Sequence, residues 1–367
     1  MSRVLLLGYF GFGNLGDEAL LEVAVTQLRR RVPEAEVSVV SAAPEETAAR
    51  LGVRAVPRTL GVGVLRAIRH CDALVIGPGG IFQDATSARS AVYYAAIARL
   101  ASLAGKRVYL VGHGIGPLRT WLGRIATRGA LARARAVSVR DKASYDLARN
   151  LCPSARLVRA ADMSLLLEPD TDAARRQCPE LFTDSLDERP NIVAVSFRPW
   201  GRGGFDADVI ARLLVSLEER LSCEFLLLPL GGEGDRRLLE AARRQIHRTP
   251  HCPRAALTPG GTLALLARCR AVLGMRLHAL VLGALAGCAL AGVAYDPKIT
   301  AFLAELGLAP VATVGEGTPA ADTVADKVVR VLGTHDAGRL SQHVGELKVN
   351  ALRNVDLLVE AAGQVTP

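Results

Sequence analysis

The chain has 367 residues, half of them hydrophobic, which is enough for two domains of ordinary size, each with its own buried core. Aromatic residues are scarce at 4%, which argues against a stacking platform for single-stranded nucleic acid or for an extended glycan. The formal net charge is +9, and two interpretations stay open: an Arg-rich composition without functional meaning, or a protein that handles anionic ligands. The basic residues form no run typical of a nucleic-acid-binding arm, so no nucleic-acid partner is expected.

The cysteine pattern indicates reduced thiols and no metal site. The seven Cys are an odd number with no C-x-x-C pair, which fits neither a disulfide framework nor a zinc site. The N-terminus has no signal-peptide pattern, and the longest apolar stretch, 279–295, is short for a transmembrane helix and contains three glycines. We therefore expect a cytoplasmic protein without a membrane-spanning segment.

The first half of the chain alternates apolar strands with helices that are apolar on one face. The expected strands are Val4–Gly8, Val37–Ser41, Ala73–Gly77, Arg107–Gly112 and Ala136–Val139. The expected helices are Asp17–Arg31 and a second one that follows the loop Pro78–Arg89 and ends at Leu103. Continuous apolar strands that alternate with helices predict a parallel sheet covered on both faces.

A polar, acidic segment with three prolines, Glu168–Pro190, is interpreted as a linker, after which the alternation restarts. The later strands are expected at Asn191–Ser196, Glu224–Pro229, Ala271–Gly274 and Ala289–Tyr295, and the later helices at Ala207–Leu221, Asp235–His247, Leu277–Ala286, Ala320–Leu332 and Leu340–Ala362. We predict an N-terminal domain over 1–167, a linker over 168–190, a C-terminal domain over 191–335, and a last helix within 336–367 that could cross back to the first domain. The fold class is α/β, with two doubly wound, Rossmann-like domains that face a central cleft and bind ligands at the carboxyl ends of their strands.

A glycine-rich turn, GYFGFGNLGDE over residues 8–18, joins the first strand to the first helix. Its G-x-G-x-x-G spacing matches the dinucleotide-binding fingerprint, in which glycines admit a phosphate to a helix N-terminus. The second strand, however, ends at Ser41 with no acid to hold a ribose, and Asp17 would repel a pyrophosphate. Two interpretations stay open: a capped structural turn, or a loop in which Asn14 and Asp17 contact a neutral sugar.

Two more glycine-rich loops follow apolar strands of the first half. The consecutive Gly79 and Gly80 would let a ligand approach the backbone closely, and Asp84 and Ser87 could contact sugar hydroxyls. The alternative for this loop is a structural turn in which Asp84 is a cap. His113, in the loop GHGIGP, is either a ligand contact or a hydrogen-bonded structural histidine.

Basic residues end strands in both halves of the chain. Arg140, in SVRD, and Arg198, in SFRPW, are candidate contacts for phosphate or carboxylate, although Arg140 could instead form a structural ion pair with the aspartate that follows it. In the second half, GMRLH places Arg276 and His278 two residues apart at a strand-to-helix junction, which suits an anionic substrate that needs proton transfer. Lys298, in YDPK, would lie near them if the two strands are neighbours, and is otherwise a solvent-exposed lysine at a helix start.

Together and in this order, the motifs resemble the polysaccharide pyruvyl transferase family. The resemblance runs from Val4 to about Phe302, and its specific parts are GYFGFGNLGDEA, SVRD, MRLH and YDPK. The most similar branch is that of the bacterial cell-wall pyruvyltransferases whose product anchors S-layer proteins. Pro78 stands where the family usually has a glycine, and His113 where a glutamine is expected; both departures concern the acceptor pocket rather than the donor site.

The resemblance implies a fold, a reaction and a set of residue roles. The fold is similar to GT-B glycosyltransferases, and the reaction forms a cyclic ketal from the pyruvate of phosphoenolpyruvate and two hydroxyls of a sugar, commonly the 4 and 6 positions. The implied acceptor is a glycan or a lipid-linked oligosaccharide that carries N-acetylmannosamine, and no cofactor or metal is implied. The residues implied to hold or activate phosphoenolpyruvate are Arg140, Arg276, His278 and Lys298. The residues implied to lie near the acceptor or the reacting centre are Asn14, Asp17 and Asp84.

The chemistry of this reaction assigns proton-transfer roles. Protonation of the methylene carbon of phosphoenolpyruvate creates an oxocarbenium-like centre, which one sugar hydroxyl attacks before the second closes the ketal. His278 is the expected acid because imidazole titrates near neutral pH, and Asp17 or Asp84 is the expected base.

Two rival hypotheses come from other function classes. A GT-B glycosyltransferase would bind a nucleotide-sugar donor and not phosphoenolpyruvate, and a non-catalytic glycan-binding module would bind glycan without turnover. A lipid-linked acceptor also leaves open a peripheral contact between the basic surface and the inner leaflet of the membrane.

Overall fold

The computed structural model describes residues 2–59, 61–84, 88–182, 191–201, 204–315 and 320–363. Within these residues the chain divides into two compact units. The first comprises Asp17–Leu166 with the flanking segments up to Phe12 and from Leu347, and the second comprises Leu167–Glu346 together with the loop Gly13–Gly16. The unit boundary after Leu166 lies beside the domain boundary expected at residue 167.

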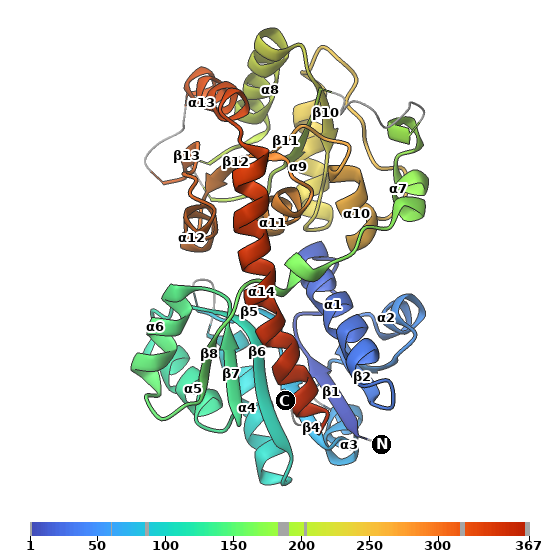
Figure 1. Ribbon diagram of the computed structural model, residues 1–367, viewed down its shortest axis with the longest axis vertical. Coiled ribbons are helices and arrows are strands. Elements are labelled where there is room, and N and C mark those ends of the chain that lie inside the picture. Colours follow the sequence, from blue (N-terminus) through green and yellow to red (C-terminus); the bar gives the residue numbers. More distant parts are fainter. Residues whose placement is uncertain are drawn as a thin grey trace. The chain divides into compact units, whose positions relative to one another are not determined.

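The first unit is built on a parallel sheet, which has eight strands in the described part of the chain (Figure 1). Seven follow the order β3-β2-β1-β4-β6-β7-β8, and β5 pairs with β6. The strands are β1 (Arg3–Leu7), β2 (Glu36–Ser41), β3 (Arg54–Pro57), β4 (Ala73–Ile76), β5 (Gly79–Phe82), β6 (Arg107–Ile115), β7 (Ala136–Val139) and β8 (Leu157–Arg159). The helices are α1 (Leu15–Arg31), α2 (Pro44–Leu51), α3 (Val62–His70), α4 (Arg89–Leu103), α5 (Trp121–Leu131), α6 (Lys142–Leu151) and the 3-10 helix η1 (Met163–Leu166).

The strand order of this sheet reverses between β1 and β4. The chain runs outward from β1 to β2 and β3, then returns to β4 and runs outward on the other side. Leu7 is in register with Val40 on one neighbour and Ile76 on the other, so the three strands end at one edge. The loops that follow β1 and β4 therefore leave the sheet next to each other, at the place where doubly wound sheets bind ligands.

The strands form because their residues are apolar on both faces. Leu6 and Leu7 of β1 and the whole of β4 are fully buried, as expected for a parallel sheet covered by helices on each side. The largest buried side chains of this core include Phe82, Tyr94 and Tyr109. The continuous apolar runs in the sequence thus predicted both the strands and their burial.

The second unit repeats the architecture on a smaller parallel sheet with the order β10-β9-β11-β12-β13 in the described residues (Figure 1). Its strands are β9 (Ile192–Ser196), β10 (Glu224–Leu227), β11 (Ala271–Gly274), β12 (Ala289–Ala294) and β13 (Ala312–Thr313). Its helices are α7 (Thr171–Gln177), η2 (Pro179–Phe182), α8 (Ala207–Leu221), α9 (Glu233–Arg243), α10 (Pro259–Leu266), α11 (Leu277–Leu285), α12 (Pro297–Glu305) and α13 (Ala321–Gly333). The reversal lies between β9 and β11, whose ends are in register at Ser196 and Gly274.

Helix α14 (Ala337–Ala361) contributes residues to both units. In the first unit its buried Asn354 accepts a hydrogen bond from the Ser138 hydroxyl at 2.7 Å and donates one to the Ala161 carbonyl at 2.9 Å. The Ser138 hydroxyl in turn accepts from the Gly112 backbone N–H at 2.8 Å. This buried network fixes the last part of the helix against β6 and β7.

The segment interpreted as a linker contains regular structure in its described part. Asp170 caps α7 by accepting a hydrogen bond from the Ala173 N–H at 2.8 Å, and η2 follows directly. The polar residues that suggested a linker thus include a helix N-cap, which composition alone does not distinguish from a loop. Residues 183–190 of the expected linker lie outside the described residues. No helix in the described residues combines the length and apolar composition needed to cross a membrane.

Candidate functional site

Four of the expected site residues come together at the strand reversal of the first unit. Gly79, with φ +140°, follows β4, and a Cβ atom placed on it would lie 3.1 Å from Oδ1 of the buried Asp17. A Cβ atom on Gly80 would lie 3.8 Å from Nη2 of Arg140. The two glycines therefore let the loop after β4 lie against a carboxylate and a guanidinium.

The positive charge of Arg140 is compensated by two carboxylates. Its guanidinium Nη1 lies 3.1 Å from Asp162 Oδ2, and its Nε lies 3.8 Å from Asp141 Oδ2. The side chain is only 8% exposed, and a Cβ atom on Gly114 would approach its Nη2 to 2.7 Å. The ion-pair alternative considered for this arginine is thus present in the structure, and the cluster in the first unit has no surplus of positive charge.

His113 lies beneath this cluster and is fully buried. Its Nδ1 is 3.1 Å from the Gly79 carbonyl oxygen, and its Nε2 is 2.9 Å from that of Ile76. Burial lowers the pKa of His113 to about 4, although the two carbonyl contacts favour the protonated form. The imidazole is therefore neutral near pH 7, and its single N–H donates to one of the two carbonyls.

Asp84 uses both carboxylate oxygens to hold the start of α5. Oδ1 accepts from the Arg119 N–H at 2.6 Å, and Oδ2 accepts from the Thr120 N–H at 2.8 Å and from the Thr120 hydroxyl at 2.5 Å. Burial opposes its ionisation, but the hydrogen bonds from Thr120 and Arg119 outweigh it and lower the pKa of the Asp84 carboxyl. A carboxylate so engaged is a weak base. The neighbouring Ser87 lies outside the described residues.

An aromatic surface in the first unit was not expected from the composition. The rings of Tyr9 and Phe12 stack with centroids 4.2 Å apart, and the two side chains are 40% and 44% exposed. Arg58 lies over the rings of Phe12, Tyr93 and Tyr94, and its Nη1 donates to the Gly8 carbonyl at 2.5 Å. The alternation of aromatic residues with glycines in GYFGF was the sequence signal for this surface.

In the second unit, two cations gather around one aromatic ring. The guanidinium carbon of Arg198 lies 5.0 Å from the ring centroid of Tyr295, and Nζ of Lys298 lies 5.6 Å from the same centroid. Arg198 also donates to the Tyr295 hydroxyl at 3.0 Å and lies 5.3 Å from the Trp200 ring. Its Nε is buried and has no hydrogen-bond partner among the described residues, whereas Lys298 pairs with Asp296 at 3.4 Å. A buried donor of this kind is suited to an anionic ligand.

Arg276, by contrast, is already neutralised. Its guanidinium binds Asp235 in a bidentate manner, with Nε to Oδ2 at 2.8 Å and Nη2 to Oδ1 at 2.6 Å. Asp235 is 1% exposed and also accepts from the Gly231 N–H. Arg276 therefore forms part of a buried ion pair that supports the start of α11.

His278 lies in the first turn of α11, against the loop Gly13–Gly16 of the same unit. A Cβ atom on Gly16 would collide with the imidazole, so this position needs a glycine. The Leu15 N–H donates to the Leu230 carbonyl at 2.9 Å, which holds the loop in place. The structure thus brings Asn14 of the first motif into the unit that carries His278.

The sequence model of the polysaccharide pyruvyl transferase family matches residues 14–297. The chain belongs to this family. The match begins at Asn14 and ends one residue before Lys298, so it includes Asp17, Gly79, Gly80 and Arg140 of the first unit and Arg198, Arg276 and Tyr295 of the second. No curated protein sequence matched the chain significantly.

Solved structures place this pyruvyl transferase family member in the GT-B fold. The UDP-GlcNAc 2-epimerase of Methanocaldococcus jannaschii has a TM-score of 0.64 and 11% identity, over 98% of this chain and 100% of that one. The Anabaena protein HepE, in complex with UDP-glucose, has a TM-score of 0.60 and 13% identity, over 99% and 100%. Arabidopsis thaliana UGT89C1 has a TM-score of 0.59 and 13% identity, over 98% and 99%. At these identities the likeness establishes the fold alone.

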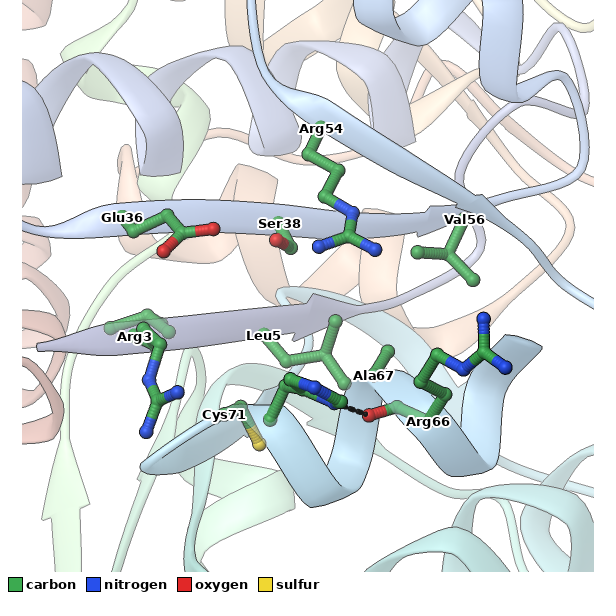
Figure 2. Close-up of a pocket in the computed structure, with 11 residues that line it drawn as sticks. Arg3, Leu5, Glu36, Ser38, Arg54, Val56, Arg66, Ala67 and Cys71 are labelled. Atoms are coloured by element: carbon green, nitrogen blue, oxygen red, sulfur yellow. Dashed lines mark hydrogen bonds between the residues drawn. The ribbon is translucent and has the colours of Figure 1, made fainter. Parts of the chain in front are cut away.

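A small cavity of the family member lies at the opposite edge of the first sheet. It has a volume of about 30 Å³, room for about one water, and is lined by the amino-terminal halves of β1, β2 and β3 and by the last turns of α3. Figure 2 shows Glu36, Arg54 and Arg66 around it. The ring nitrogen Nδ1 of His70 lies 2.8 Å from the Arg66 carbonyl oxygen. Its position at the amino ends of the strands separates it from the clusters described above.

One cluster of metal-ligand residue types occurs in the described residues, although the sequence suggested none. The ligand atoms of Cys178, Glu180 and His251 lie within 4.8 Å of one another, near the amino end of β10. Burial and a hydrogen bond to Glu180 raise the pKa of the Cys178 thiol, and Arg254 lies 3.3 Å from the Glu180 carboxylate. Two of the three groups already have protein partners, since His251 Nε2 lies 2.8 Å from Glu224 Oε2 and Arg254 pairs with Glu180.

Proposed function

We propose that this protein transfers pyruvate from phosphoenolpyruvate to a sugar as a cyclic ketal. The reaction joins C2 of phosphoenolpyruvate to two sugar oxygens, breaks the bond from C2 to the phosphate oxygen and adds a proton to C3. The two sugar hydroxyls lose their protons, and inorganic phosphate is released. Family membership supports a pyruvyl transferase, and the cations at the strand ends of the second unit, Arg198 and Lys298, support an anionic donor.

The observation that carries the donor assignment is the pair of cations at Tyr295. Phosphoenolpyruvate carries a carboxylate and a phosphate, so its site needs more than one cation. Arg198 offers a buried Nε without a protein partner in the described residues, and Lys298 lies over the same ring. The charge of Arg276 is compensated by its ion pair with Asp235, so Arg276 is assigned a supporting position at the donor site.

Proton transfer is assigned to His278 and Asp17. The proposed acid for C3 is His278, which lies in the first turn of α11, next to Arg276 in the MRLH motif. Of the two carboxylates considered as base, Asp17 is assigned because it lies beside Gly79 at the strand reversal, whereas Asp84 holds the start of α5. A base that must first release three hydrogen bonds would lose much of its driving force.

The acceptor is assigned to the first unit, where the charges at the strand ends are balanced. The stacked Tyr9 and Phe12 present exposed aromatic faces to which the apolar face of a sugar ring can pack. The cell-wall branch that the motifs resemble suggests N-acetylmannosamine on a lipid-linked precursor, with the ketal on its 4 and 6 hydroxyls. This acceptor and the cytoplasmic location of the reaction form part of the proposal.

The test is phosphate release from phosphoenolpyruvate with and without a lipid-like disaccharide that carries N-acetylmannosamine. We expect release only with acceptor, and a product heavier than the acceptor by one pyruvate less one water. A calorimetric titration with phosphoenolpyruvate examines the donor site separately. It compares the same preparation of the protein with the Arg198→Gln variant.

Two other results would redirect the proposal. Binding of phosphoenolpyruvate without release would show that the acceptor is a different sugar. No binding of phosphoenolpyruvate by folded protein, with tight binding of a UDP- or GDP-sugar, would instead favour a nucleotide-sugar transferase of the same fold.

A further inference from the structure

We infer that helix α5 of the first unit docks the protein on an anionic phospholipid surface. The inference concerns a face that the proposed pyruvyl transfer does not use, and it would bring the enzyme to a lipid-linked acceptor. It therefore adds a location to the proposed function, but its test requires no catalytic activity.

The excess positive charge of the whole chain lies in one continuous segment. Residues 85–140 contain nine Arg and one Lys and no Asp or Glu. The whole chain has 45 basic and 36 acidic side chains. The other 311 residues therefore carry 35 basic side chains and all 36 acidic ones. A segment of 56 residues that contains α4, β6, α5 and β7 thus accounts for the net charge of +9. Such a concentration of one sign attracts an anionic surface.

Helix α5 combines this charge with an exposed apolar face. Trp121, Leu122 and Ile125 are 73%, 43% and 58% exposed, and at 100° per residue they cover about 100° of the helix circumference. Arg124 and Arg128 are exposed and lie along one flank of this stripe. The opposite side packs into the unit through Gly123, Thr127, Ala130 and Leu131. The solvent side of α5 is therefore apolar with a basic border, as in helices that lie in a membrane interface.

The start of α5 is held rigidly in this orientation. The Asp84 carboxylate binds the backbone N–H groups of Arg119 and Thr120, and the Thr120 hydroxyl caps the helix at the Gly123 N–H. Trp121, the first residue of the helix, is thus presented at a fixed point of the surface. A Trp at the boundary of an apolar stripe is suited to the level of the lipid headgroups.

The charge around the stripe favours lipid over another copy of this chain. Arg119, Arg124 and Arg128 form no ion pair with any carboxylate of the described residues. Two copies joined through this face would bring these like charges together, whereas a phosphatidylglycerol surface would neutralise them. Three long apolar side chains at its centre also match the acyl boundary better than the hydrophilic backbone of a nucleic acid.

The test is co-sedimentation with vesicles of phosphatidylcholine alone and of equimolar phosphatidylcholine and phosphatidylglycerol. We expect binding to the anionic vesicles that weakens as salt is added. The Arg124→Gln/Arg128→Gln variant should bind about 25-fold more weakly, at about fivefold per arginine. The Ile125→Ser variant should bind about tenfold more weakly because it removes a buried apolar side chain.

Matched variants outside α5 test whether any loss of positive charge or of an exposed apolar side chain weakens vesicle binding. Arg244→Gln/Arg330→Gln removes the same charge from the second unit, and Val349→Ser removes an apolar side chain that is 67% exposed on α14. Neither should change vesicle binding more than about twofold by the same charge and area arguments. Thermal melts of all variants would show that they are folded.

Fluorescence gives a second readout that reports on α5 itself. The chain has two Trp, so the Trp200→Phe variant leaves Trp121 as the single indole. Its emission should shift to the blue on anionic vesicles and be quenched by brominated acyl chains. The proposal is wrong if folded protein does not bind anionic vesicles, if it binds without a change in Trp121 emission, or if α5 variants alter only self-association or nucleic-acid binding.

Discussion

The two units share one architecture but differ in the charge at their strand ends. In the first unit, Arg140 is buried against Asp162 and Asp141, and the nearby Asp17 adds a carboxylate. In the second unit, Arg198 has no carboxylate partner in the described residues, and Lys298, which pairs with Asp296, shares the Tyr295 ring with it. The same place in a doubly wound sheet is thus balanced in one unit and cationic in the other.

This difference suggests a division of labour between the units. A neutral sugar needs aromatic surface and hydrogen bonds, which the first unit offers through Tyr9, Phe12 and Asp17. A donor with a carboxylate and a phosphate needs a cation that is not already neutralised, and in the second unit Arg198 has no carboxylate partner among the described residues. The predictions below test whether donor and acceptor binding separate along this line.

The largest effect is expected from the proposed acid of the second unit. His278→Ala should lower turnover at least about a hundredfold, because a positioned general acid typically contributes 10²–10⁴ in rate. Steady-state phosphate release measures turnover, and calorimetry should show that phosphoenolpyruvate still binds. The matched control His335→Ala changes an exposed histidine remote from the strand ends and should retain activity. Near-normal turnover of His278→Ala would remove this residue from the mechanism.

Two arginines of the second unit should respond differently to the same change. Arg198→Gln should raise the KM for phosphoenolpyruvate about ten- to hundredfold with little change in melting temperature, because its charge is available for the ligand. Arg276→Gln should destabilise the fold by about 3 kcal/mol, because the buried Asp235 loses its counterion. Thermal melts and KM measurements on both variants make the comparison.

A double variant provides the control for this pair. Arg276→Gln/Asp235→Asn should recover much of the lost stability, because both charges are then absent. If Arg198→Gln lowers the melting temperature as much as Arg276→Gln does and leaves the KM unchanged, Arg198 supports the fold and is not the donor cation.

Much of the fold could be predicted from the sequence because the strands are continuous apolar runs. The expected strand Ala136–Val139 has the same bounds in β7, and Ala271–Gly274 the same bounds in β11. Shorter or more polar elements were not expected, such as β3 and α2, because charged residues at exposed positions hide their pattern. The described part of 168–190 was interpreted as a linker because its N-cap and prolines are also typical of loops.

The candidate site was predictable in position but not in charge. Residues at strand ends must lie at one edge of a parallel sheet, which explains why Arg140, Arg198 and Arg276 could be selected. Which of them is neutralised depends on distant acids, since Asp235 is 41 residues from Arg276 and Asp162 is 22 residues from Arg140. No motif contains these pairs, and only the fold brings them together.

Acid should weaken the first unit more than the second, because it contains the fully buried His113. Its folded pKa of about 4 lies below the unfolded value of 6.5, so the unfolded chain binds the proton first as the pH falls. The contribution of the neutral His113 to the free energy of unfolding is fully present above pH 6.5 and is lost as the pH falls toward 4. At pH 5 the loss is about 2 kcal/mol. His113→Gln cannot take up this proton and should remove that loss.

Buried free cysteines allow each unit to be followed separately. Cys71 and Cys152 report on the first unit, and Cys223 and Cys269 on the second. The buried cysteines are labelled with a disulfide reagent in urea at pH 5 and pH 7, and mass spectrometry then gives the extent to which each unit unfolds. An equal response of both units to acid, or an unchanged response in His113→Gln, would contradict the role given to this histidine.

The smallest effect is expected at the aromatic surface of the first unit. Phe12→Ala removes one face of the stacked pair with Tyr9, so the KM for the acceptor should rise about five- to tenfold, as expected for one aromatic packing partner. Phe12→Tyr keeps the ring and should retain the original KM, which separates stacking from a general disturbance of the loop. The KM for phosphoenolpyruvate should stay unchanged in both variants, because the donor cations belong to the second unit. A rise in the KM for phosphoenolpyruvate alone would place the donor, rather than the sugar, at the charge-balanced strand ends of the first unit and would reverse the division of labour.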